Sequence, residues 1–139
     1  MQAYQVTAFD AAPELIEIAC PAPAAGQIAV RIEACGLNFA DLLMQKGTYQ
    51  DTPTLPFVPG LEVSGTVTAL GETVTEFKSG DRVAVFCGQG GLAEEGVCDA
   101  SRAVRIPDSR SFEHAAALQI AYGTSLVALD HCARLQPGE

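Results

Sequence analysis

Positive charge is scarce in this sequence of 139 residues, which has 8 lysine and arginine residues against 17 aspartate and glutamate residues and a net charge of -9. The phosphates of a nucleic acid or of an anionic membrane would repel such a chain. Long hydrophobic runs are also absent, since no stretch approaches the roughly 18 apolar residues of a membrane-spanning helix. Residues 1–5 lack the basic and apolar regions of a signal peptide. We therefore expect a cytoplasmic protein with no nucleic-acid or membrane partner.

Paired cysteines are missing as well. The five cysteines form no Cys-x-x-Cys pair, and their number is odd. Neither a disulfide framework nor a structural zinc is therefore expected. The simplest interpretation is small, buried apolar side chains in a reducing cytoplasm. A reactive thiol at Cys35 or Cys87 is the alternative.

The pattern of apolar residues is mainly that of β-strands. Residues 27–33 alternate strictly, with Ile28, Val30 and Ile32 on one face. Residues 1–9 and 15–18 resemble a hairpin that turns at residues 10–13. Further short strands separated by glycine and proline turns are predicted at residues 61–70, 82–87, 96–99 and 103–106. A chain of 139 residues fits one domain, and many short strands favour a barrel or a sandwich.

Helical patterns occur in two places. One helix is predicted at about residues 38–46, and Asn38 is a suitable N-cap for it. After Pro107 the pattern changes to helix, with Ser111 as N-cap and Glu113 in the first turn. We expect Gly123 to end this helix and a second one to cover residues 124–134. The predicted organisation is a mainly β domain at residues 1–110 followed by a helical segment at residues 111–139.

No Gly-x-Gly-x-x-Gly lies between a strand and a helix. The backbone amides that hold a cofactor's pyrophosphate in a Rossmann fold are therefore not expected here. Residues 88–91 are rich in glycine, but no predicted helix follows them. We interpret them as a flexible loop.

Two segments resemble the zinc alcohol dehydrogenases with the metal ligands replaced. Residues 59–65, Pro-Gly-Leu-Glu-Val-Ser-Gly, are similar to a segment in which those enzymes carry a liganding histidine at the position of Leu61. Residues 36–41 resemble a segment in which a liganding cysteine stands at the position of Asn38. Further motifs follow in the family's order and spacing, namely Gly47 with Tyr49, Val67, Gly71, Val74, Phe77 and residues 80–83. The chain thus resembles the zinc-independent, quinone-oxidoreductase-like branch of the medium-chain dehydrogenase/reductase superfamily.

The resemblance implies a fold and a reaction. The fold would be a GroES-like barrel, the front portion of a two-domain enzyme whose Rossmann domain is absent from this chain. The reaction would be hydride transfer from NADPH or NADH to a quinone or an α,β-unsaturated carbonyl, without zinc. The enzyme would be a homo-oligomer, and this chain alone is expected to be inactive. A stand-alone GroES-like binding module without redox activity is the alternative.

Three residues are candidates for the cleft that would hold acceptor and nicotinamide: Asn38, Tyr49 and Thr124. Each has a structural alternative. Asn38 could act only as a helix cap, with Asp41 at the capping-box position. Tyr49 could be an amphipathic loop aromatic, and Thr124 an N-cap after Gly123. The counterparts of Asp41 and Glu62 support the metal site in the zinc enzymes, so a supporting role is expected for both.

Overall fold

An antiparallel hairpin opens the chain in the computed structural model, which describes residues 1–138. Its strands are β1 (Gln2–Gln5) and β2 (Glu14–Glu17). The predicted hairpin is confirmed, but its first strand is shorter than expected. The chain leaves the hairpin after Gln5 because Val6 pairs with Phe57 instead, with its N–H 2.8 Å from the Phe57 carbonyl oxygen.

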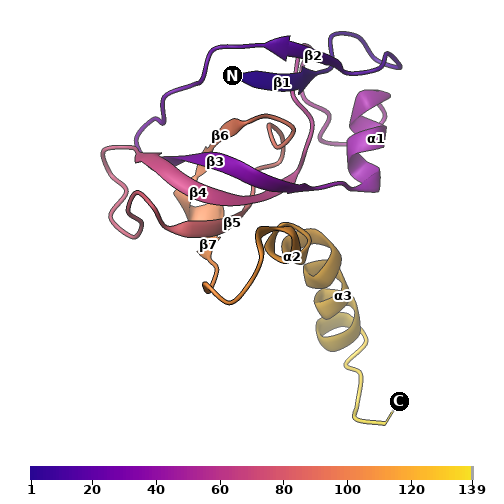
Figure 1. Cartoon of the computed structure of the whole chain (residues 1–139). Coiled ribbons are helices and arrows are strands. Elements are labelled where there is room, and N and C mark those ends of the chain that lie inside the picture. The colour runs from indigo at the N-terminus through magenta and orange to yellow at the C-terminus, as the bar shows by residue number, and fades with distance from the viewer. Residues whose placement is uncertain (139) are drawn as a thin grey trace.

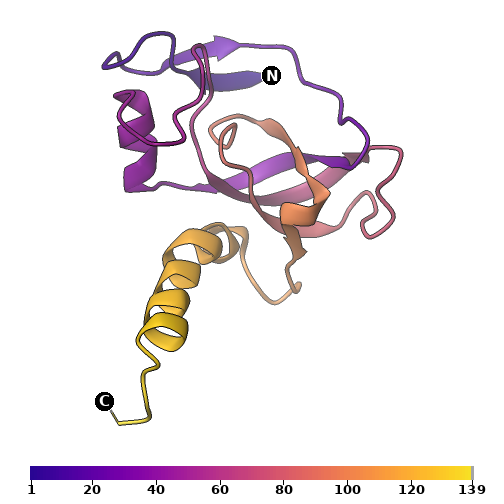
Figure 2. The same cartoon turned by 180° about the vertical axis from the view of Figure 1, so that it is seen from behind.

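Five strands form the main sheet, in the order β6-β3-β4-β5-β7, and each neighbouring pair is antiparallel. Figures 1 and 2 show this sheet from its two sides, with the hairpin above it. Every strand predicted from the sequence is present, within a few residues at the ends. The bounds are β3 (Gln27–Gly36), β4 (Glu62–Leu70), β5 (Arg82–Phe86), β6 (Glu95–Asp99) and β7 (Ala103–Arg105).

The core of the sheet consists of β-branched side chains from its three central strands. Ile28 and Val30 of β3 are buried together with valines of β4 and β5, and Cys98 of β6 completes the cluster. Such side chains pack well on a pleated surface, and their burial removes apolar area from water at about 25 cal/mol per Å². The period-two pattern of β3 therefore identified the buried face correctly.

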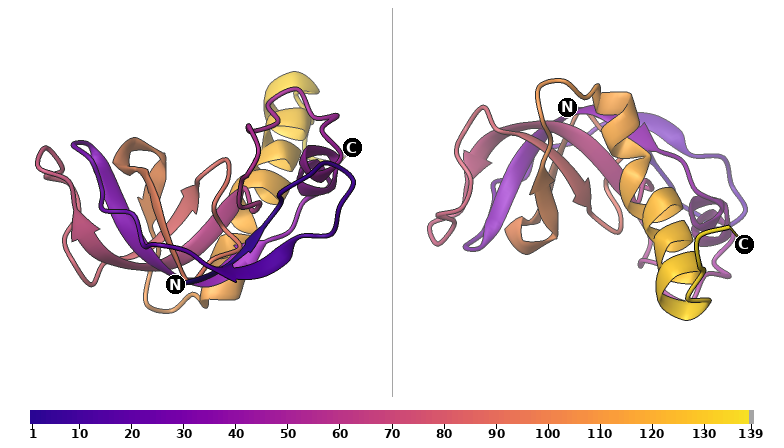
Figure 3. Two further views of the ribbon diagram at one scale, coloured as in Figure 1. Left: turned by 90° about the horizontal axis from the view of Figure 1, so that it is seen from above. Right: turned by 90° about the horizontal axis from the view of Figure 1, so that it is seen from below.

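The mainly β fold with helices expected from the sequence is confirmed. The sheet curves strongly but stays open within residues 1–138, with β6 and β7 as its edge strands. Figure 3 shows this curvature from above and below. The helix α1 (Phe39–Gln45) and, below it, the C-terminal helices lie on the same side of the molecule, at the right in Figure 1 and at the left in Figure 2.

Asn38 starts α1, as predicted. Its backbone is extended, with φ -124° and ψ 156°, and its N–H donates to the Asp41 carboxylate at 2.9 Å. The carboxylate at the third helical position thus satisfies a backbone donor at the helix start.

The C-terminal helices begin as predicted and end at Cys132, two residues before the predicted end. Ser111 caps α2 (Phe112–Ala116) by accepting the His114 N–H. The helix then runs through the π-helical turn η2 (Leu118–Tyr122), α3 (Gly123–Leu126) and the π-helical turn η3 (Val127–Cys132). None of the helices within residues 1–138 is long and apolar enough to span a membrane.

The prediction that Gly123 ends a helix was wrong. Gly123 has φ -60° and ψ -45°, which is ordinary helical geometry, and its carbonyl accepts the Val127 N–H. Glycine weakens a helix by about 1 kcal/mol relative to alanine but does not forbid it. Thr124 therefore lies inside the helix and is not an N-cap.

The first of these helices packs on the sheet although it lies beyond the predicted boundary at residue 110. Ala115 is buried against Ala84 and Ile106, and the Ser64 hydroxyl donates to the Phe112 carbonyl at 2.5 Å. The division into residues 1–110 and 111–139 stays a prediction.

Candidate functional site

Leu61 is part of a second hydrophobic cluster, to which α1 and the residue that follows β1 also contribute. It is buried with Val6, Met44 and Phe57. Its carbonyl oxygen accepts the backbone N–H groups of Cys87 and Gly88 at 2.8 and 3.0 Å. The segment around residue 61 is thus fixed by both its side chain and its backbone.

A buried carboxylate connects the start of α1 to the C-terminal helices at this site. Glu62 is 2% exposed, and its Oε1 accepts from the Asn38 side-chain amide at 3.1 Å. Its Oε2 accepts the Ile120 backbone N–H at 2.9 Å. A buried carboxylate is tolerated only where donors replace its water, and here two donors do so. Glu62 therefore orients the Asn38 amide and fixes the C-terminal helix against the start of α1.

A second buried carboxylate, that of Asp41, accepts hydrogen bonds in the same region. This carboxylate accepts the N–H groups of Asn38 at 2.9 Å and of Gly60 at 2.8 Å. Burial raises the pKa of the Asp41 carboxyl, and the two N–H donors act in the opposite direction. These bonds hold residue 60 beside the first turn of α1.

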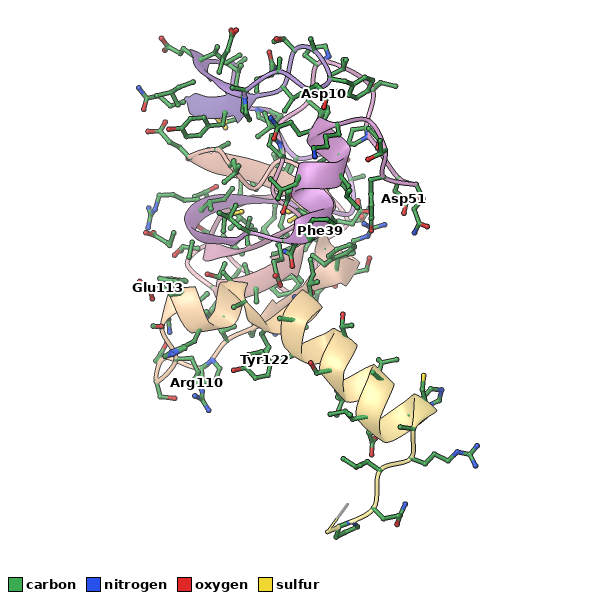
Figure 4. All side chains as sticks on the ribbon, turned by 90° about the vertical axis from the view of Figure 1, so that its right-hand side faces the viewer. Asp10, Phe39, Asp51, Arg110, Glu113 and Tyr122 are labelled. Atoms are coloured by element: carbon green, nitrogen blue, oxygen red, sulfur yellow. The ribbon has the colours of Figure 1, made fainter. Side chains whose placement is uncertain are left out.

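A cavity of about 510 Å³ opens beside Leu61. Tyr49 lines it, together with Met44, Pro53 and Cys87. Its mouth is polar, with exposed side chains from the loop after α1, from the glycine-rich loop and from the short helix before β7: Asp51, Gln89 and Arg102. Figure 4 shows Asp51 standing out from the loop beyond α1. The volume lies within the range of small-molecule sites.

The structure brings the predicted site residues together only in part. Tyr49 and Ile120 both pack on the cluster that contains Leu61, and Glu62 connects Ile120 to Asn38. Thr124 lies one helical turn after Ile120, is exposed, and does not line the cavity. Its neighbour Tyr122 projects from the C-terminal helix into solvent (Figure 4). The cleft roles of Asn38, Tyr49 and Thr124, and the supporting roles of Asp41 and Glu62, stay predictions.

The residues at the two former ligand positions do not fit zinc. The Leu61 side chain has no lone pair, and the Asn38 amide nitrogen already donates to Glu62. Within residues 1–138, no three histidine, cysteine, aspartate or glutamate side chains gather as a metal site would require.

The comparison with known families decides the assignment. Residues 24–108, more than half of the chain, match the family described as "Alcohol dehydrogenase GroES-like domain". The chain belongs to this family. Among curated proteins, it is 52% identical over 114 residues to "Quinone oxidoreductase-like protein 2 homolog" of Nematostella vectensis, covering 81% of this chain and 31% of that protein. It is 43% identical over 128 residues to "Quinone oxidoreductase-like protein 2" of Mus musculus, covering 91% and 37%.

Solved structures of this kind superpose closely on the GroES-like domain. The human synaptic vesicle membrane protein VAT-1 homolog-like protein gives a TM-score of 0.94 at 37% identity, covering 99% of this chain and 45% of that one. The quinone oxidoreductase of Thermus thermophilus, also solved with NADPH, gives 0.84 at 36% identity, covering 100% and 42%. The resemblance to the quinone-oxidoreductase-like branch is thus confirmed. The chain spans about a third of the curated relatives and less than half of the solved chains.

All five cysteines are free, but the expectation that they are buried was wrong for Cys20 and Cys132, which are exposed. Burial raises the pKa values of Cys35, Cys87 and Cys98 to about 12 each. The Cys87 thiol also donates toward the carbonyl oxygens of Gly60 and Leu61 at 3.3 and 3.2 Å. These raised pKa values act against the alternative of a reactive thiol at Cys35 or Cys87, because the thiolate is the nucleophile.

We expect alkylation of the native protein to separate the cysteines into two groups. At pH 8, iodoacetamide should modify the exposed Cys132, and more slowly Cys20, whose pKa is raised by its hydrogen bond to Glu95. Cys35, Cys87 and Cys98 should react roughly 10³-fold more slowly than a free thiol, since so little thiolate is present. Peptide mass spectrometry over time measures this, and a denatured sample is the control. Rapid native labelling of Cys87 would contradict the geometry.

Sequence reasoning missed two parts of the site. The bond from Glu62 to Ile120 joins residues 58 positions apart, and no local pattern announces it. Arg102 at the cavity mouth was also missed, because a single cation near a short strand has no distinctive spacing. The only sequence feature that could have drawn attention to Arg102 was the scarcity of basic residues in the chain.

Proposed function

We propose that this GroES-like domain forms the substrate side of an NADPH- or NADH-dependent reductase of quinones or α,β-unsaturated carbonyls that works without zinc. The single observation that carries the proposal is that non-ligand residues stand at the two positions where the zinc enzymes carry metal ligands. Leu61 is packed in an apolar cluster, and the Asn38 amide donates to the buried Glu62 carboxylate. Both positions thus serve hydrogen bonding and packing, and neither offers a metal-binding thiolate or imidazole.

The absence of metal ligands selects the substrate. A nicotinamide cofactor supplies a hydride, which an electron-poor carbon accepts without further activation. A simple alcohol, by contrast, needs a Lewis acid to help release its proton. Quinones and enones are therefore the acceptors that this residue set fits.

The residues of the cavity would bind and orient such an acceptor. Met44, Pro53 and Leu61 give the cavity an apolar wall against which a ring can pack. The Tyr49 phenol can donate a hydrogen bond to an acceptor oxygen. Glu62 holds the Asn38 amide beside the same cluster.

The cofactor would lie largely on another part of the enzyme. The glycine-rich residues 88–91 precede the strand β6, so no helix N-terminus follows to bind a pyrophosphate. The exposed apolar face of the C-terminal helices would pack on the cofactor domain or on a second subunit, and we propose a cytoplasmic homo-oligomer. This face consists of Leu118, Tyr122, Leu126, Val127 and Leu129.

A chimeric enzyme tests the proposal. Residues 1–138 replace the matching part of the Thermus thermophilus quinone oxidoreductase, to which the chain is 36% identical. We expect NADPH oxidation by 1,4-benzoquinone that a chelator does not inhibit, no oxidation of a simple alcohol with NADP⁺, and zinc well below one equivalent by elemental analysis. The matched control is Asn38→Cys with Leu61→His, which restores both donors and should raise the zinc content. Stoichiometric zinc in the unsubstituted chimera, lost together with activity on chelation, would overturn the proposal.

A further inference from the structure

One cation lies at the mouth of the cavity described above. Arg102 ends the short helix η1 (Ala100–Arg102), which leads from β6 into β7. Its guanidinium carbon is 5.9 Å from the centre of the Phe86 ring, and Phe86 also lines the cavity. Its Nη1 lies 3.8 Å from the point where residue 88 would carry a Cβ, so the guanidinium lies beside the glycine-rich loop. The ring and the glycine loop thus place the guanidinium at the rim.

The N–H donors of Arg102 have no hydrogen-bond partner within residues 1–138. It forms an ion pair with Asp99, with Nε and Oδ2 3.8 Å apart, which is too long for a hydrogen bond. Arg82 differs, because its guanidinium donates to the carbonyls of Pro107 and Arg110 at 2.9 and 2.7 Å. Arg105 likewise donates to Asp81 and to the Glu76 carbonyl. Arg102 is therefore placed at the cavity with its donors available to a ligand.

We propose that Arg102 binds a negatively charged substituent of the acceptor, so that the substrate class is an anionic quinone or enone such as a carboxylate or a sulfonate. The inference rests on the proposed function, in which this cavity takes the acceptor. The apolar lining receives the ring, and the planar guanidinium fork matches the two oxygens of the anion.

Two carboxylates at this site repel an anion. One of them provides a control in which a substitution should increase the affinity for the anion. Asp51 lines the same cavity, and Asp99 lies beside the guanidinium. Both are acidic groups in a chain of net charge -9, so a long-range field does not attract the anion. Affinity for the anion therefore depends on direct contact with Arg102, and removing the Asp51 charge should increase it.

The test measures binding to the chain itself and does not need turnover. The probes are 9,10-anthraquinone-2-sulfonate and the uncharged 2-(hydroxymethyl)anthraquinone, titrated by NMR with assigned amides of residues 86–89. We expect the sulfonate to bind about fivefold more tightly than the uncharged ring, with the difference shrinking in high salt. Arg102→Gln should remove that fivefold difference and leave the affinity of the uncharged ring unchanged. Asp51→Asn should tighten sulfonate binding by about twofold. Arg134→Gln, which removes a cation outside the cavity, is the matched control.

The outcomes separate the inference from the proposed function. Equal affinities for the two probes at the cavity, or an equal loss of both in Arg102→Gln, would overturn the role of Arg102 and leave the reductase proposal standing. Sulfonate shifts that lie away from residues 86–89, or no binding of either probe, would also overturn it. A sulfonate preference lost in Arg102→Gln, combined with an inactive chimera, would support the site and reject the reaction.

Discussion

Joined to an NADPH-binding domain, the chain is expected to reduce 1,4-benzoquinone on the order of 10⁵-fold faster than it does alone. The physical reason is orientation. In the proposed enzyme, Tyr49 and the cavity beside Leu61 would form one wall of a cleft, and no helix follows the glycine-rich residues 88–91 to hold a pyrophosphate opposite them. Without that second wall the nicotinamide is not held against the acceptor, and the effective molarity of a bound pair, about 10⁵ M or more, is lost.

Stopped-flow measurement of NADPH absorbance tests this expectation on two proteins, the 139-residue chain and the chimera with the Thermus thermophilus domain. The unaltered Thermus thermophilus enzyme is the control for the assay. Turnover by the short chain at a rate near that of the chimera would overturn the assigned division of labour between the two walls. Quinone binding by the short chain combined with an inactive chimera would favour a binding module without redox activity.

Substitution of Gly65 by alanine is expected to lower the free energy of unfolding by roughly 3 kcal/mol or more. Gly65 pairs with Ile32 of β3, next to the register shift between Ile32 and Ala34. A Cβ there would collide with the backbone carbonyl oxygen of Arg31 and would lie 2.8 Å from Cγ1 of Val30. Since the Arg31 carbonyl oxygen belongs to the backbone and cannot rotate away, β3 and β4 would have to move apart. Urea unfolding followed by circular dichroism measures the loss.

The matched control is the same substitution at Gly123. There φ is -60°, and a Cβ would meet no atom within 4 Å. Alanine should therefore stabilise the helix by about 0.5–1 kcal/mol, because it restricts the unfolded chain and fits the helix. A loss of stability in Gly123→Ala would contradict the continuous C-terminal helix, and an unchanged stability in Gly65→Ala would contradict the close approach of β3 and β4.

The sequence by itself determined the local structure and the absence of zinc ligands. The alternation of Ile28, Val30 and Ile32 identified β3, and Ser111 identified the start of α2. These features depend on residues close together in the chain, where side-chain period and capping chemistry act directly. Leu61 likewise excluded a metal ligand through the chemistry of one side chain.

Only the tertiary structure decided what the site contains. The course of the helix through Gly123 was wrongly predicted, because a local propensity of about 1 kcal/mol is easily outweighed by the helix on either side. The bond from Glu62 to Ile120 and the place of Arg102 at the cavity depend on strands and loops far apart in the chain. A buried carboxylate must find its donors wherever the fold places them, so its partners are a property of the packed chain and not of its neighbours in sequence.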